Sequence, residues 1–170
     1  MLHAISPIDG RYHSKTQELS QYFSEYALIK ARVNVEIEYL IALAGLNLPQ
    51  LKNLNDEQIK LLRNIVSSFT ESDAQKIKDT ERITNHDVKA VEYFVKEKLE
   101  GINLGSVKEF VHFGLTSQDI NNTATPMLTK HALSTVVFPA IESIILKLTD
   151  LAQQWKNVPM LAHTHGQPAS

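Results

Sequence analysis

Apolar residues recur at helical spacing along most of the chain. Over residues 24–44 this spacing predicts a helix, and Gly45 stands where a glycine commonly ends one. Asn55 is expected to cap the next helix. The apolar positions of that helix keep the same period: Ile59, Leu62, Ile65, Val66 and Phe69. Residues 87–99 continue the pattern, and Gly101 is expected to stop it.

Two more helix starts are expected from capping boxes, in which two side chains three residues apart bond each other's backbone N–H groups. Ser72 with Gln75 has this spacing, and so does Ser106 with Glu109, ahead of a short helix. The longest helix is expected near residues 136–156. Its apolar positions form a broad stripe: Val137, Ile141, Ile144, Ile145, Leu148, Leu151, Ala152 and Trp155. Such a stripe favours burial against partner helices.

These patterns place the chain in the all-α class, because no segment alternates apolar and polar residues as a half-buried strand would. We expect an N-terminal helical domain over residues 1–112, followed by the beginning of a long-helix bundle over residues 113–170. The stripe of the last helix has few obvious partners within the chain, and the sequence stops inside a polar segment. The chain is therefore expected to be cut from a longer protein.

Composition narrows the class of protein. The 170 residues are 43% hydrophobic and 21% charged with a net charge of −2, and no basic stripe suggests nucleic acid as a partner. Without cysteine, disulfides and thiolate chemistry are excluded. No signal peptide is recognisable, and no uninterrupted apolar run approaches the roughly 18 residues of a membrane span. We expect a cytoplasmic protein.

Four short polar segments stand apart from the helical scaffold, two of them in the first half of the chain. Asp9-Gly10-Arg11-Tyr12 could offer a guanidinium and a ring face to an anionic or planar ligand, although a plain surface turn is the favoured interpretation of these residues alone. Thr84-Asn85-His86-Asp87 precedes a helix, where Asn85 or Thr84 could be the cap. Helix N-termini also favour anions, so His86 could contact phosphate or carboxylate.

The other two segments lie in the second half. Thr116-Ser117-Gln118-Asp119 has capping-box spacing, and its two hydroxyls could also hold a carboxylate. Pro126 is expected to break or kink the helix that follows. His163-Thr164-His165-Gly166-Gln167-Pro168 would place both rings on one face if extended. Because further ligands are missing nearby, general acid–base chemistry is favoured over a metal site.

Together these segments resemble one family. TSQDINN and THGQPA are similar to two signatures of the fumarase/aspartase superfamily. SPIDGRY, TNHDVKAVEYF and FVHFGLTSQDINN resemble its bacterial adenylosuccinate lyase branch, and the resemblance covers nearly all of residues 4–169. It implies fumarate elimination from adenylosuccinate, giving AMP, and from the succinylated aminoimidazole carboxamide ribotide. Argininosuccinate lyase, fumarase and a non-catalytic helical assembly module are the alternatives.

The resemblance also assigns residues. His165 matches the general acid, and His112 lies near the family's site. Seven residues match substrate-binding positions: Arg11 and Tyr12 for the nucleotide, Asn85, His86 and Asp87 for the substrate, and Thr116 and Ser117 for its succinyl part. No cofactor or metal is implied. The expected partners are a small purine nucleotide and other copies of the chain in a homotetramer, with no nucleic acid or membrane. The catalytic serine loop of the family is not among these residues, so the chain alone is expected to be inactive.

Overall fold

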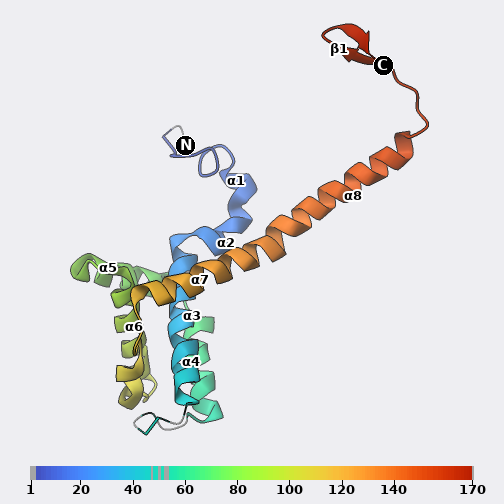
Figure 1. The fold of residues 1–170 in the computed structure, drawn as a ribbon. Coiled ribbons are helices and arrows are strands. Elements are labelled where there is room, and N and C mark those ends of the chain that lie inside the picture. The colour runs from blue at the N-terminus through green and yellow to red at the C-terminus, as the bar shows by residue number, and fades with distance from the viewer. Residues whose placement is uncertain (1–2, 47, 50, 52–53, 170) are drawn as a thin grey trace. The chain divides into compact units, whose positions relative to one another are not determined.

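The computed structural model describes residues 3–46, 48–49, 51 and 54–169 (Figure 1). The chain divides into two compact units, Met1–Ala132 and Leu133–Ser170, which are treated separately below. Apart from one small hairpin, the regular structure of the described residues is helical, which confirms the all-α class. The domain boundary expected after residue 112 stays a prediction.

The first unit begins with short helical turns and continues with longer helices. Its elements are α1 (His13–Thr16), η1 (Gln17–Leu19), α2 (Ser20–Phe23), α3 (Glu25–Ala44), α4 (Asp56–Ser67), α5 (Glu71–Thr84), α6 (Asp87–Gly101), η2 (Gly105–Phe110) and α7 (Ser117–Ala132). The second unit contains a π-helical turn η3 (Leu133–Val137), α8 (Phe138–Trp155), and strands β1 (Ala162–Thr164) and β2 (Gln167–Ala169).

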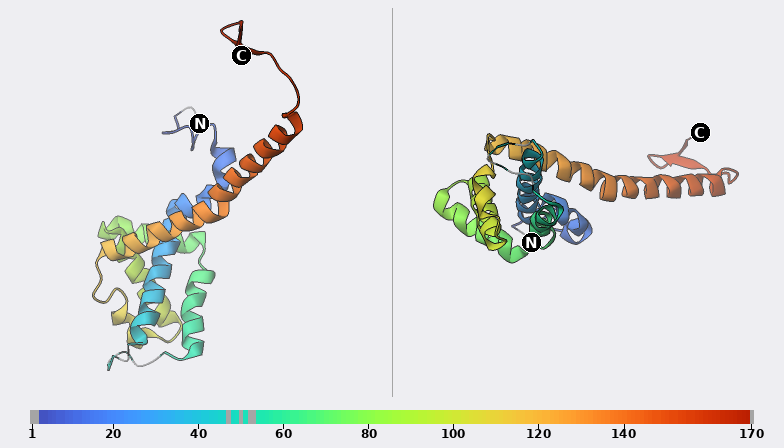
Figure 2. Two further views of the ribbon diagram at one scale, coloured as in Figure 1. Left: turned by 45° about the vertical axis from the view of Figure 1, so that its right-hand side comes forward. Right: turned by 90° about the horizontal axis from the view of Figure 1, so that it is seen from below.

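Helix α3 is the centre of the first unit. Its start is set by Ser24, whose side chain accepts the N–H of Ala27, and it ends at Gly45 as expected. Gly45 has a right-handed φ of −69°, so the glycine does not serve here as a left-handed cap. α3 packs against α4, α6 and α7, and Figures 1 and 2 show α7 crossing it. The core along α3 follows helical spacing: Ile29, Val33, Ile37 and Leu40.

The capping predictions have mixed outcomes. Asn55 caps α4 in a full capping box with Gln58, which confirms that expectation. The box that opens α5 is formed by Thr70 and Asp73, so the prediction of Ser72 with Gln75 was wrong by two residues. Thr70 still has an extended backbone and Ser72 already lies inside the helix, which removes it from the cap position. The short helix near Ser106 is a 3₁₀ helix without a side-chain cap.

Pro126 lies inside α7 without ending it, so a break does not occur there, and the alternative, a kink, stays a prediction. Proline removes the hydrogen bond to the carbonyl of Asn122. Both residues are exposed, so water can bind that carbonyl in place of the missing N–H. On the opposite side of α7, Ile120 and Ala124 are buried one turn apart and hold the helix in the first unit.

No residue of α8 is buried, and all of its residues are described. The large apolar side chains that it exposes are Phe138, Ile141, Ile144, Ile145, Leu146, Leu148 and Trp155. The helical stretch Ser117–Trp155 is long and apolar enough, by composition alone, to cross a membrane, with a mean hydropathy of 1.5 over 18 residues. A single helix of this kind is weak evidence for a membrane span. Glu142, Lys147 and Asp150 recur along α8, which is typical of an amphipathic bundle helix.

Candidate active site

Two charged side chains are buried side by side in the apolar surroundings of α3. Arg32 is 6% exposed and Glu36 is fully buried. Residues four apart lie on one face of a helix, so both charges point the same way. Buried charges need close partners. The partners of these two residues come from the polar segments that the sequence singled out.

Arg32 joins α6 to α7. Its Nη2 lies 2.7 Å from Oδ2 of Asp87, and its Nε donates to Oδ1 of Asn121 at 2.9 Å. Partial burial opposes ionisation of Asp87, but the Val88 N–H and the Arg32 guanidinium outweigh it and lower the pKa of this carboxyl. Asp87 therefore remains an anion that anchors the start of α6 beside α7.

The segment before α6 is a tight link between two helices. Asn85 ends α5 with a left-handed φ of 51°, and its N–H donates to the carbonyl of Glu81. The cap of α6 is His86, whose Nδ1 accepts the N–H of Lys89 at 3.1 Å. The expectation that Asn85 or Thr84 caps α6 was therefore wrong. Asn85 and His86 are both exposed and so remain accessible to a ligand.

At the start of α7, Thr116 and Asp119 bind each other. Oδ2 of Asp119 accepts the Thr116 N–H at 2.7 Å and the Thr116 hydroxyl at 2.8 Å, and these bonds lower the pKa of Asp119. The Ser117 hydroxyl makes no hydrogen bond among the described residues. Ser117 precedes Asn121 by one turn, so it lies on the face of α7 that contacts Arg32. Of the two neighbouring hydroxyls, that of Thr116 binds Asp119, and that of Ser117 is available to a ligand.

Glu36 holds a third segment, the turn before α7. Its Oε2 accepts the backbone N–H of His112 at 3.1 Å, and its Oε1 lies 2.6 Å from Nδ1 of the same residue. Burial raises the pKa of Glu36, and the hydrogen bonds and charge of His112 oppose that shift. The α3 face thus gathers the segments that contain His86, Ser117 and His112.

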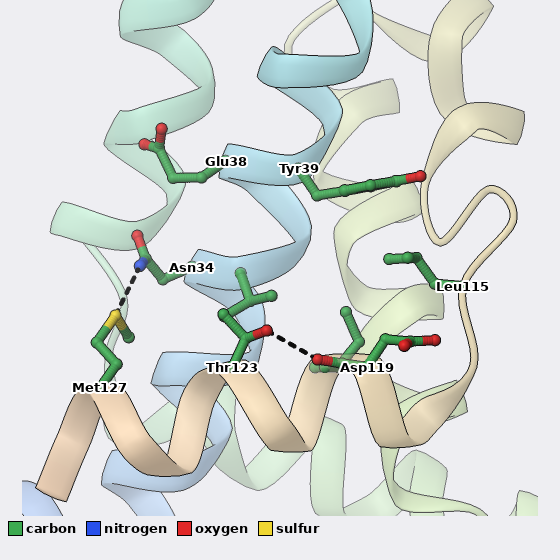
Figure 3. Close-up of a pocket in the computed structure, with 9 residues that line it drawn as sticks. Asn34, Glu38, Tyr39, Leu115, Asp119, Thr123 and Met127 are labelled. Carbon is green, nitrogen blue, oxygen red and sulfur yellow. Dashed lines mark hydrogen bonds between the residues drawn. The ribbon is translucent and has the colours of Figure 1, made fainter.

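A groove of about 370 Å³ lies between α3 and α7 (Figure 3). Asn34 and Met127 lie at one end of it, and Leu115 and Asp119 at the other. Its remaining lining residues are Val35, Glu38, Tyr39, Ile120 and Thr123. None of the seven predicted substrate-binding residues lines this groove, but Asp119, which binds Thr116, does.

Arg11 and Tyr12 occupy a turn of their own. The turn is closed by Asp9, which accepts the N–H and the hydroxyl of Ser6 at 2.8 and 2.6 Å. Those bonds hold the pKa of Asp9 below its usual value. The Arg11 guanidinium lies 4.9 Å from the centre of the Tyr12 ring. Across the described part of the chain, no hydrogen bond or ion pair joins either residue to the other predicted site residues.

His165 lies in the second unit, in the turn of the hairpin. β1 pairs antiparallel with β2, with His163 opposite Pro168 and Thr164 opposite Gln167. His165 and Gly166 have φ values of 54° and 77°, which defines the two-residue turn that matches strand twist. Because His165 is in the turn, the chain is not extended through both histidines, and the condition for their rings to share one face is not met. No cluster of three or more metal-ligating side chains occurs among residues 3–46, 48–49, 51 and 54–169.

The sequence analysis missed Arg32, Glu36 and Asn121. Arg32 and Glu36 each precede a core position, Val33 and Ile37, but Lys30 and Glu38 adjoin core positions too and are not buried, so adjacency alone gave no signal. The partners of Arg32 and Glu36 lie 55 to 89 residues away in sequence, where periodicity carries no information.

Comparison with known proteins identifies the family of the chain. The chain matches the lyase family over residues 10–170 and belongs to that family. Among curated relatives it is 57% identical to adenylosuccinate lyase of Dictyostelium discoideum and 47% identical to those of Vibrio cholerae and Escherichia coli K12, in each case over 99% of this chain. The chain spans 37–38% of the length of these relatives.

Proposed function

We propose that the chain forms part of an adenylosuccinate lyase, which eliminates fumarate from adenylosuccinate to give AMP and from the succinylated aminoimidazole carboxamide ribotide. The proposal is supported by the similarity to adenylosuccinate lyases along 99% of the chain. Argininosuccinate lyase, fumarase and a non-catalytic helical module are not favoured, because all the relatives named above are adenylosuccinate lyases.

One observation of the geometry carries the proposal. Arg32 binds Asp87, the first residue of α6, and also Asn121, one turn into α7, so the N-terminal turns of two helices are held beside one arginine. Helix N-termini stabilise negative charge. The succinyl part of the substrate has two carboxylates, and helix N-termini would stabilise their negative charge. The further negative charge that develops as the proton on carbon is removed needs this stabilisation more.

Each predicted site residue would have a distinct role in binding or catalysis. Ser117 binds a succinyl carboxylate, Asn85 and His86 contact the substrate, and Asp87 holds their segment in place through Arg32. Arg11 and Tyr12 contact the nucleotide. His165 protonates the departing nitrogen, a contribution of about 10²–10⁴-fold in rate. The proton on carbon is removed by a base outside this chain.

Assembly and location are part of the proposal. A homotetramer would bring residues of several subunits into one site and would cover the apolar side chains that α8 exposes. A purine nucleotide substrate is consistent with a cytoplasmic protein. The chain alone is expected to release no fumarate, since the base belongs to another part of the enzyme.

The test is a chimaera in which this chain replaces the matching segment of the D. discoideum enzyme. Fumarate release from adenylosuccinate is expected, with none from argininosuccinate. His165→Asn should lower kcat by at least about 10²-fold. Asparagine tolerates the left-handed backbone of the turn, so the hairpin should persist. His163→Asn is the matched control on β1 and should keep kcat. A folded but inactive wild-type chimaera would contradict the proposed function.

A further inference from the structure

Glu36 uses both of its carboxylate oxygens on one residue. Oε2 accepts the backbone N–H of His112 at 3.1 Å, and Oε1 meets the Nδ1 of its ring at 2.6 Å. Glu36 is fully buried, whereas the His112 side chain is 16% exposed. The pair is therefore a buried carboxylate that supports an imidazole at the edge of the protein.

The backbone of His112 is held in an uncommon conformation. Its φ is 60°, in the left-handed region that non-glycine residues seldom adopt. A single oxygen on the backbone N–H would be enough to anchor such a turn. The second oxygen orients the ring, and it contributes nothing to the backbone. Strain of this kind persists only where the surroundings impose it, and it concentrates at functional positions.

The two ring nitrogens of His112 are in different situations. Nδ1 is committed to Glu36, whereas Nε2 has no hydrogen-bond partner in the described part of the chain. No buried side-chain nitrogen or oxygen among the described residues lacks a partner, so Nε2 must be reached by solvent. An ionised carboxylate only accepts hydrogen bonds. With Glu36 ionised, the proton between the two groups therefore belongs on Nδ1, and Nε2 carries the lone pair when the ring is neutral.

We propose that Glu36 is a positioning residue that fixes the tautomer and orientation of His112, so that Nε2 is the atom through which this ring meets a substrate. The ring stands near the start of α7, since its charge acts on Asp119, and Glu92 of α6 faces Glu36 with its own charge paired by Lys89 and Lys96. That the ligand at Nε2 is the lyase substrate rests on the proposed function. The tautomer itself does not.

Glu36→Gln gives a specific expectation. A glutamine has one acceptor oxygen, and the His112 N–H requires it, so the amide NH₂ faces Nδ1. Nδ1 must then accept, and the proton moves to Nε2. The opposite orientation would set the NH₂ against the backbone N–H. The substitution should thus invert the tautomer while changing the shape of the side chain very little.

The first measurement is ¹⁵N NMR of the histidine rings in the 170-residue chain, at a pH where their signals no longer move with pH. His112→Asn assigns the signal. The wild-type ring should carry its proton on Nδ1, and the Glu36→Gln ring on Nε2. Glu38→Gln is the matched control, because Glu38 lies on the same helix but pairs with Arg63 at the surface, and it should leave the tautomer unchanged. A neutral wild-type ring protonated on Nε2 overturns the inference, even if Glu36→Gln does not fold.

The second measurement is the pH profile of kcat and kcat/KM in the chimaera. Glu36→Gln should lower kcat/KM by about tenfold or more and change the profile, as expected when a working imidazole is held in the wrong tautomer. Glu38→Gln should leave both unchanged. Wild-type kinetics in a folded Glu36→Gln chimaera would overturn the inference. An inactive wild-type chimaera would instead refute the proposed function and leave the NMR result to decide the pair.

Discussion

The ion pair between Arg32 and Asp87 should respond unequally to removal of either member. The Arg32 side chain is 7% exposed and that of Asp87 is 43% exposed, with 2.7 Å between Nη2 and Oδ2. Removing Asp87 leaves a buried cation without its anion. Removing Arg32 leaves an anion that water can reach and that still accepts the Val88 N–H at 2.8 Å. Comparing the loss in free energy of unfolding for the two substitutions therefore tests whether burial of each charge determines the effect of removing its partner.

The magnitudes follow from that exposure. Breaking a buried pair by removing one partner costs about 3–5 kcal/mol. Asp87→Ala should fall near the lower limit, about 3 kcal/mol, because Asn121 still accepts from Arg32. Arg32→Met keeps much of the apolar stem volume and frees a solvated carboxylate, so about 1 kcal/mol is expected. The difference should be about 2 kcal/mol, or roughly a 30-fold change in the unfolding equilibrium.

The assay is urea unfolding of the 170-residue chain, followed by far-UV and tyrosine near-UV circular dichroism. All five tyrosines precede residue 132 and report the first unit, whereas the single tryptophan, Trp155, lies in α8. Arg63 and Glu38 form the control pair, since both side chains are well exposed, at 57% and 42%. Alanine at either should cost less than about 1 kcal/mol. The reasoning is refuted if Arg32→Met destabilises as much as Asp87→Ala.

Thr70→Ala should lose about 1 kcal/mol of stability as a lost cap, whereas Ser72→Ala should stay within about 0.5 kcal/mol; equal costs in urea unfolding would contradict the observed box. Partial burial opposes ionisation of Asp73, but hydrogen bonds from Lys98 and Thr70 outweigh it and hold the pKa of this carboxyl below its ordinary value of 3.8. The ionised Asp73 therefore contributes its full stabilisation at any pH above the ordinary pKa of an aspartate. This contribution is lost as the pH falls through the lower pKa of the folded state. Below about pH 4, Tm should fall more steeply in the wild type than in Asp73→Asn. In the chimaera, Ser117→Ala should keep the melting temperature and lose about tenfold or more in kcat/KM, the value of a hydrogen bond to a charged group. Thr116→Ala should instead cost about 1 kcal/mol of stability, because it removes the hydrogen bond from the Thr116 hydroxyl to the Asp119 carboxylate; the reverse pattern would exchange their roles.

Local features of the fold could be predicted from the sequence because their causes are local. Ser24 and Asn55 bond to N–H groups three residues away, and apolar spacing locates the helices that follow them. The same reasoning failed at Thr70 and Ser72, since each has a suitable side chain three residues later and only the backbone decides between them. The hairpin was missed because its strands are short and its turn depends on His165 and Gly166 both taking positive φ.

The candidate site was predictable in its members and unpredictable in its connections. The motifs located His86, Ser117 and His112, but what holds them together is a pair of charges on α3. Arg32 and Glu36 reach residues far away in sequence, and no local pattern specifies which distant group a buried charge will meet. The structure supplies those pairings, and with them the reason that α3 contains charges in its buried face.

The same pairings give two histidines of the candidate site, His86 and His112, opposite chemical roles. Nδ1 of His86 accepts a backbone N–H, so a neutral His86 carries its proton on Nε2 and presents a donor. Nδ1 of His112 faces a carboxylate, so a neutral His112 presents an acceptor at Nε2. Protonating His86 on Nδ1 would break the cap of α6, whereas protonating His112 on Nε2 would leave its bond to Glu36 in place. His112 is therefore the ring of the two that can take up a proton without disturbing the fold, and His86 is suited to donating a fixed hydrogen bond to an anion.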